Sequence, residues 1–94
     1  MSIYDQIAIK IIKEQESLMG PLAWLQAGKV TGIKIIDRQS GIISIEAKDE
    51  TLVINNLVGT FESLFGRAGR EVCKDAVSAL IAELQPNQIP SSLK

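Results

Sequence analysis

The chain has 94 residues, of which 46 % are hydrophobic and 22 % charged, and this composition is typical of one globular domain. Ten basic and eleven acidic residues give a net charge of −1, so no strong field of one sign favours nucleic acid or an anionic membrane as a partner. One cysteine excludes an internal disulfide. The absence of histidine removes the most common metal ligand and the side chain that titrates nearest to neutral pH.

Two helices are predicted at the start of the chain. Ser2 and Asp5 have the spacing of a capping box, which opens a helix. Apolar residues then recur at helical spacing on one face, although Ile9 falls on the polar side; the face comprises Tyr4, Ile7, Ala8, Ile11 and Leu18. The Gly-Pro pair at 20–21 interrupts this pattern, and a second, short helix is expected over 22–27.

A β-hairpin is predicted from two short isoleucine-rich segments, 31–37 and 42–47, which are joined by turn residues ending in Gly41. If Ile36 faces Ile42 across the turn, one face of the hairpin becomes a floor for the helices, formed by Ile33, Ile35, Ile43 and Ile45. Ile36 and Ile42 then lie on the opposite face and form a second apolar patch.

Two further helices are predicted after the hairpin. Asp49 can cap the first of them, whose apolar stripe comprises Val53, Ile54, Leu57, Val58, Phe61, Leu64 and Phe65. Glycines interrupt the pattern at 66–69, and the last helix runs from about 67 to 84, ahead of Pro86. We therefore predict a single α+β domain over 1–85, ordered α-α-β-β-α-α, with the helices on one face of the hairpin. Residues 86–94 are predicted to be a flexible C-terminal tail.

No residue pattern typical of an enzyme is visible. Cys73 has no histidine to activate it, and its helical spacing with Val77 and Leu80 indicates a core thiol. The tightest acidic pair, Asp49 and Glu50, is explained by the start of a helix. We expect no catalytic residue, no metal and no cofactor.

The segment 64–72 resembles the G-x-x-G loop of KH domains, which joins two helices and clamps a nucleic-acid backbone. The resemblance implies contacts from Gly66, Arg67, Gly69, Arg70 and Lys74. The chain departs from the family in its longer preceding helix and in having no strand after the last helix. Acidic residues near the loop also offset the positive charge of its basic residues. The alternative is a tight helix–helix turn, in which glycines provide positive φ or allow close approach of the backbone.

The last helix carries apolar residues over a wider arc than the roughly 100° that is usual for a surface helix. A two-stranded sheet also leaves two open edges. Both features favour a second copy of the chain, although a monomer whose helices wrap the hairpin is also possible. The expected contact residues are Val72, Ala76, Val77, Leu80, Ile81 and Leu84 on the helix, together with Ile36 and Ile42.

The leading functional prediction is a non-catalytic interaction module that forms a homodimer, with another protein as a further candidate partner. One alternative is nucleic-acid binding at the glycine loop. Another is a small-ligand sensor with an apolar pocket near Trp24, Phe61 and Phe65. Charged residues throughout the first helix argue against a signal peptide, and no apolar run approaches the ~20 residues of a membrane span. With a single thiol, these features favour a cytoplasmic location.

Overall fold

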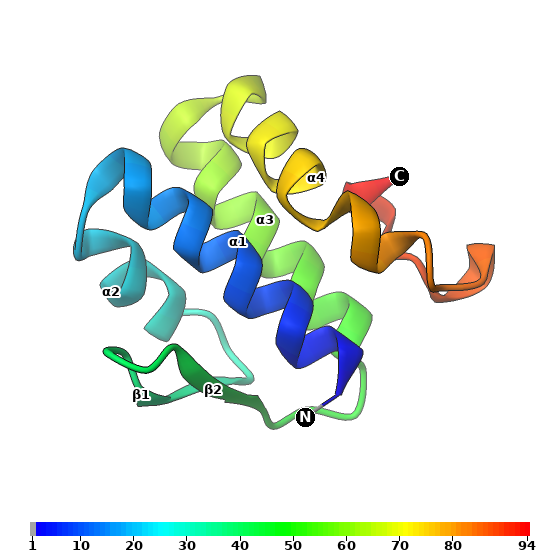
Figure 1. Cartoon of the computed structure of the whole chain (residues 1–94), viewed down its shortest axis with the longest axis horizontal. Coiled ribbons are helices and arrows are strands. Elements are labelled where there is room, and N and C mark those ends of the chain that lie inside the picture. Colours follow the sequence, from blue (N-terminus) through cyan, green and yellow to red (C-terminus); the bar gives the residue numbers. More distant parts are fainter. Residues whose placement is uncertain (1) are drawn as a thin grey trace.

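A computed structural model describes residues 2–94 and has the predicted order of elements (Figure 1). The elements are α1 (Ile3–Met19), α2 (Leu22–Gly28), β1 (Ile33–Asp37), β2 (Ile42–Ile45), α3 (Glu50–Phe65) and α4 (Arg67–Ile81), followed by the short 3₁₀ helices η1 (Pro86–Gln88) and η2 (Ser91–Leu93). Within residues 2–94, no helix is both long and apolar enough to cross a lipid bilayer.

The helix boundaries follow local capping chemistry. The Ser2 hydroxyl accepts the N–H of Asp5, whose carboxylate in turn accepts the N–H of Ser2, so the predicted capping box is present. The Asp49 carboxylate accepts the N–H of Leu52 and caps α3. Gly20 and Gly66 follow α1 and α3 with φ of 70° and 68°, values at which a side chain would be strained. These bounds were therefore predictable from short sequence motifs.

The hairpin has the predicted register along most of its length. Ile33 pairs with Ile45 and Ile35 with Ile43, but Asp37, rather than Ile36, lies opposite Ile42. The predicted pairing of Ile36 with Ile42 is therefore wrong.

The cause of this shift is the start of the turn. The Asp37 carboxylate accepts hydrogen bonds from the N–H of Gln39 at 3.0 Å and from the hydroxyl of Ser40 at 2.9 Å. The turn is thereby anchored at Asp37, and Ile36 remains as the extra residue of a bulge.

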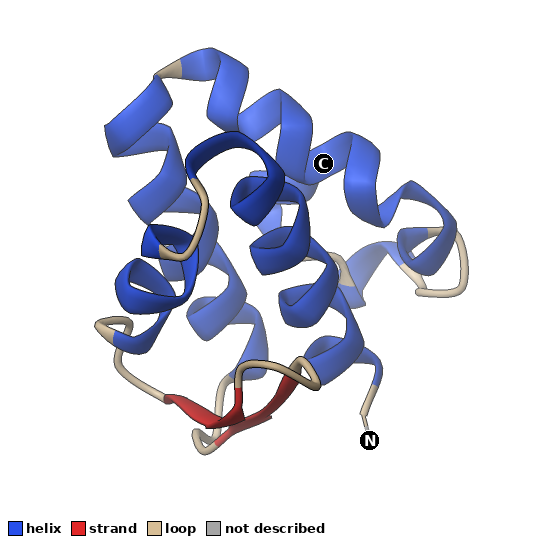
Figure 2. Ribbon diagram, turned by 60° about the vertical axis from the view of Figure 1, so that its left-hand side comes forward, coloured by secondary structure: helices blue, strands red, loops and turns tan. Residues whose placement is uncertain are grey.

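The helices lie together on one side of the hairpin (Figure 2). Helix α1 contacts β2 and α2 contacts β1, whereas α3 and α4 pack on α1 and on each other. All four α-helices and both strands contribute to one core; its buried members are Ile7, Ala8, Ile11, Ile12, Ala23, Trp24, Ala27, Val30, Ile33, Ile43, Val53, Ile54, Leu57, Val58, Phe61, Cys73, Val77 and Leu93.

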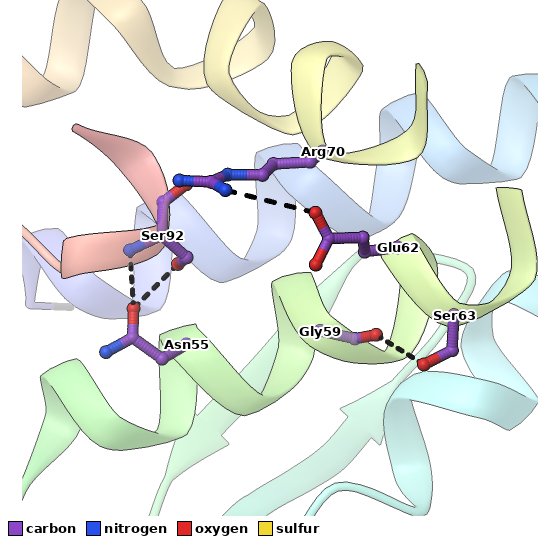
Figure 3. Close-up of polar contacts among 6 residues, drawn as sticks. All are labelled: Asn55, Gly59, Glu62, Ser63, Arg70 and Ser92. Carbon is purple, nitrogen blue, oxygen red and sulfur yellow. Dashed lines mark hydrogen bonds and ion pairs between the residues drawn. The ribbon is translucent and has the colours of Figure 1, made fainter. Parts of the chain in front are cut away.

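Residues 86–94, predicted to be a flexible tail, instead pack across α3 and α4. Leu93 is 5 % exposed and Pro90 is buried, so both contribute to the core. The Ser92 N–H and hydroxyl donate to Asn55 Oδ1 at 3.0 and 2.6 Å, and Arg70 Nε donates to the Ser92 carbonyl (Figure 3). At the other end of the segment, the Tyr4 hydroxyl donates to the Gln88 carbonyl at 2.8 Å. The apolar residues of this segment and its contacts with distant residues give it a fixed place.

Candidate functional site

The apolar arc of α4 is largely accounted for within one protomer. Val77, predicted as a contact residue, is completely buried and cannot meet a partner. Leu80, Ile81, Leu84 and Ala76 are partly buried against the core, and Val72 also keeps partial exposure. The reason is that α4 packs on α1, on α3 and on η2, so several neighbours share its broad apolar surface. A role for these partly exposed residues in a protein contact stays a prediction.

The two hairpin residues predicted to form a second apolar patch are both exposed to solvent, although they do not lie opposite each other. Ile36 is 59 % exposed and Ile42 is 39 % exposed. The edge of β2 is less open than predicted, because the Ile45 N–H donates to the Asp5 carboxylate at 3.2 Å. This hydrogen bond blocks strand addition at that position of β2.

Helices α1 and α3 end, and α4 begins, at the same end of the helical bundle (Figure 1). Residues at these helix ends form a second exposed apolar surface. Its members are Leu18, Leu64 and Phe65, which are 58 %, 48 % and 40 % exposed. We call these residues the bundle-end patch. All of them belong to the apolar helix faces found in the sequence, but most other members of those faces are buried, whereas these residues are exposed.

Contacts through α4 bring the last turns of α1 and α3 close to each other. Gln15 lies one turn before Leu18 and donates from Nε2 to the Gly69 carbonyl at 3.2 Å. Gly69 in turn lies against Phe65, because a Cβ built on Gly69 would be 3.1 Å from the Phe65 Cβ. The end of α1 is thus linked to the end of α3 through Gln15 and Gly69.

The glycine loop has a structural explanation for each of its glycines. Gly66 has positive φ and serves as the boundary between α3 and α4. Gly69 is buried, and a Cβ there would lie 2.7 Å from the carbonyl oxygen of Phe61. Positive φ at Gly66 and close approach of the backbone at Gly69 are the two roles that a tight helix–helix turn, the alternative to a KH-like loop, requires of its glycines.

The basic residues near this loop differ in their surroundings. Arg67 is exposed, whereas Arg70 is held by the Ser92 carbonyl and lies 4.0 Å from the Glu62 carboxylate (Figure 3). Lys74 is partly buried. Arg67 is therefore the residue of this group that is most open to a phosphate, and nucleic-acid binding stays a prediction.

Cys73 belongs to a buried cluster between α1 and α4. Gln15 is completely buried and donates from Nε2 to the Cys73 sulfur at 3.4 Å, while its Oε1 has no hydrogen-bond partner. Burial raises the pKa of the Cys73 thiol to about 11, with Gln15 partly offsetting the shift. The thiol is protonated and inaccessible at neutral pH, as the core-thiol prediction requires.

This raised pKa predicts a loss of stability at alkaline pH. The unfolded chain releases the Cys73 proton near the ordinary thiol pKa, before the folded chain does, so the free energy of unfolding falls as pH rises from about 9 towards 11. We expect a loss of about 1–2 kcal/mol across this window. Cys73→Ala should remove that slope, which urea denaturation at successive pH values would measure. Burial also raises the pKa of Tyr4, but Tyr4 is present in both chains, so its contribution to the pH dependence cancels in the comparison. Parallel profiles for the two chains would contradict the assignment.

An open cleft lies between α2 and β1. Its volume is about 340 Å³, and it is lined by Trp24, Leu25, Gly28, Lys29, Ile35 and Arg38. Trp24 was expected near a pocket and is part of this one, but Phe61 is completely buried in the core and Phe65 belongs to the bundle-end patch. The predicted grouping of the three aromatic residues is therefore wrong. The indole N–H of Trp24 donates to the Glu16 carboxylate at 2.6 Å, which fixes the orientation of the ring.

Neither a cluster of metal-binding side chains nor a match to a known family indicates a function for the surfaces described above. Residues 2–94 contain no group of three or more His, Cys, Asp or Glu side chains that could hold a metal ion. Comparison with protein-family models, with curated proteins and with solved structures finds no match to this chain.

Proposed function

We propose that this chain is a small, non-catalytic interaction module that associates with a second copy of itself through the bundle-end patch. The observation that carries the proposal is the exposure of Leu18, Leu64 and Phe65 at the same end of the bundle, where α1 and α3 end. Single exposed apolar residues are ordinary, but a group of large ones is typical of a contact surface.

A symmetric dimer is the form of association that fits this surface best. In a two-fold contact the same patch occurs on both protomers, so Phe65 and Leu64 of one copy would pack against those of the other. Glu14, one helical turn before Leu18, and Arg67, two residues after Phe65, are both exposed and would contribute to the polar rim of such a contact. The predicted cytoplasmic location belongs to this proposal, since a lone buried thiol suits a reducing compartment.

The proposal predicts that Leu64→Lys abolishes self-association. We expect the wild-type chain to sediment as a dimer at ~100 μM, a concentration well above micromolar dissociation constants. Lysine near the end of α3 is favourable for the helix dipole, so the variant should fold and sediment as a monomer. Sedimentation equilibrium, with circular dichroism as the check of folding, measures both.

Leu52→Lys is the matched control, because Leu52 lies at the opposite end of α3 and is 53 % exposed, close to the 48 % of Leu64. This variant should remain a dimer. Ile36→Lys tests the outer face of the hairpin in the same way. A wild-type chain that is monomeric at ~100 μM would refute self-association, and a dimer lost in Ile36→Lys but retained in Leu64→Lys would move the contact to the hairpin.

A further inference from the structure

The cleft between α2 and β1 combines an apolar wall with two cationic side chains. Leu25, which is 56 % exposed, and Ile35 line it together with Trp24, which is almost fully buried. Lys29 and Arg38 lie on elements that flank the same space, since Lys29 follows α2 and Arg38 follows β1. An apolar surface with a small number of charged groups is typical of a ligand site, and a volume of about 340 Å³ suits a small ligand.

Within residues 2–94, no carboxylate forms an ion pair with the two cationic side chains of the cleft. Among residues 2–94 the recorded ion pair is the one between Arg70 and Glu62, so neither Lys29 nor Arg38 has a carboxylate within 4.0 Å. No acidic residue lines the cleft. Glu16, which accepts the indole N–H of Trp24, and Asp37, which accepts hydrogen bonds from the turn, are anions near the cleft, but neither carboxylate lies within 4.0 Å of the Lys29 or Arg38 nitrogens.

Gly28 keeps the cleft open. A Cβ at this position would lie 3.5 Å from the Ile35 side chain, and the backbone of Gly28 does not have a positive φ. A larger residue at this position would therefore occupy the cleft without straining the chain. Substitution of Gly28 by a larger residue would therefore block the cleft without removing any side chain that is proposed to contact the ligand.

A second open cleft, between α1 and the hairpin turn, has less to recognise a ligand. Its volume is about 360 Å³, and its lining is Gln6, Ile9, Lys10, Lys13 and Gly41. It carries two lysines, but Ile9 is its only large apolar residue, and no arginine is present to bind an anion with a planar pair of N–H groups. The cleft between α2 and β1, in contrast, has both a wall of several large apolar residues and an arginine.

We propose that the cleft between α2 and β1 binds a small aliphatic monocarboxylate, whose chain lies along Trp24, Leu25 and Ile35 and whose carboxylate meets Arg38 and Lys29. The arginine fork matches the geometry of a carboxylate, and the apolar wall selects an aliphatic chain over a compact polar anion. This site is separate from the bundle-end patch, so either proposal can fail without the other.

The test is a titration with hexanoate and octanoate, followed by backbone amide shifts and by the fluorescence of Trp24, the single tryptophan of the chain. We expect saturable shifts at Gly28, Lys29, Ile35 and Arg38. Each added CH₂ should tighten binding by about two- to fourfold, up to the value for full burial. Hexan-1-ol, which has the chain but no charge, should bind more weakly than hexanoate.

Arg38→Gln should weaken hexanoate binding by about two- to fivefold, as expected for a solvent-exposed ion pair, and should leave hexan-1-ol unaffected. The matched control is Arg67→Gln, an exposed arginine outside the cleft, which should bind hexanoate as the wild type does. Gly28→Leu should abolish the binding of both ligands.

Three results would overturn the proposal. One is the absence of a saturable response to either acid. Another is equal affinity for hexanoate and hexan-1-ol together with no effect of Arg38→Gln, which would leave only a non-specific apolar contact. The third is a set of shifts that map to Lys10 and Lys13 instead, which would assign the anion to the other cleft.

Discussion

A chain that ends at Gln85 will be much less stable than the 94-residue chain. Removal of residues 86–94 exposes the part of the core that Leu93 and Pro90 cover and leaves Asn55 and Arg70 without their Ser92 partners. Burial of a leucine side chain contributes about 1.5–3 kcal/mol, and a hydrogen bond about 1 kcal/mol. We expect the free energy of unfolding to fall by about 4 kcal/mol, a large part of the 5–15 kcal/mol that is typical of natural domains.

Urea denaturation followed by circular dichroism measures this loss. Leu93→Ala in the full chain separates the packing contribution and should cost about 2–3 kcal/mol. Removal of Lys94 alone is the control, because this residue is exposed and the change should leave the midpoint unaltered. If the chain ending at Gln85 denatures at the same midpoint as the full chain, the packing of the segment contributes nothing and the predicted flexible tail is correct.

Replacement of Gly69 by alanine will destabilise the fold, although alanine is the better helix former. Intrinsic propensity favours alanine over glycine by about 1 kcal/mol in a helix. At Gly69, however, the added Cβ would lie 2.7 Å from the Phe61 carbonyl oxygen, which belongs to a helix backbone and cannot rotate away. Overpacking of this kind costs about 1–3 kcal/mol. We expect a net loss of about 1–2 kcal/mol for Gly69→Ala and a larger loss for Gly69→Val.

Gly59→Ala is the matched control for this prediction. Gly59 lies within α3 and has no atom within 4 Å of the position that a Cβ would occupy. The same substitution there should raise the free energy of unfolding by about 0.5–1 kcal/mol. Thermal and urea denaturation of the two variants should thus move in opposite directions. If Gly69→Ala also stabilises the chain, α3 and α4 are not in close contact at this point.

The bounds of the elements were predictable because short motifs set them. The capping box at Ser2 and Asp5, the cap at Asp49 and the glycine at 66 act through hydrogen bonds and backbone angles within a few residues. Pairing of Ile35 with Ile43 was also predictable, because a one-residue slip would have divided the isoleucines between the two faces. The bulge at Ile36 escaped prediction because the Asp37 side chain, rather than the hydrophobic pattern, places the start of the turn.

Burial was less predictable than secondary structure, because a helical stripe does not say where the neighbouring helix ends. Leu18 and Gln15 are nearly on the same face of α1, yet Gln15 is buried against α4 and Leu18 is exposed beyond it. Ile9 shows the opposite error. It fell on the predicted polar side of α1, but the hairpin turn at Gly41 packs beside it. Neither the exposure of Leu18 nor the partial burial of Ile9 has a signal in the local sequence. The members of the bundle-end patch could therefore not be predicted from the spacing of apolar residues.

The amino-acid sequence by itself determined an α+β chain with helices and a hairpin in a given order, since propensity, caps and periodicity are interactions between near neighbours. Tertiary structure alone decided which apolar residues face solvent, that Pro90 and Leu93 of the C-terminal segment join the core, and that Arg38 and Lys29 flank one cleft with Trp24. These outcomes depend on contacts between residues far apart in the chain, whose geometry is fixed only when the helices pack together.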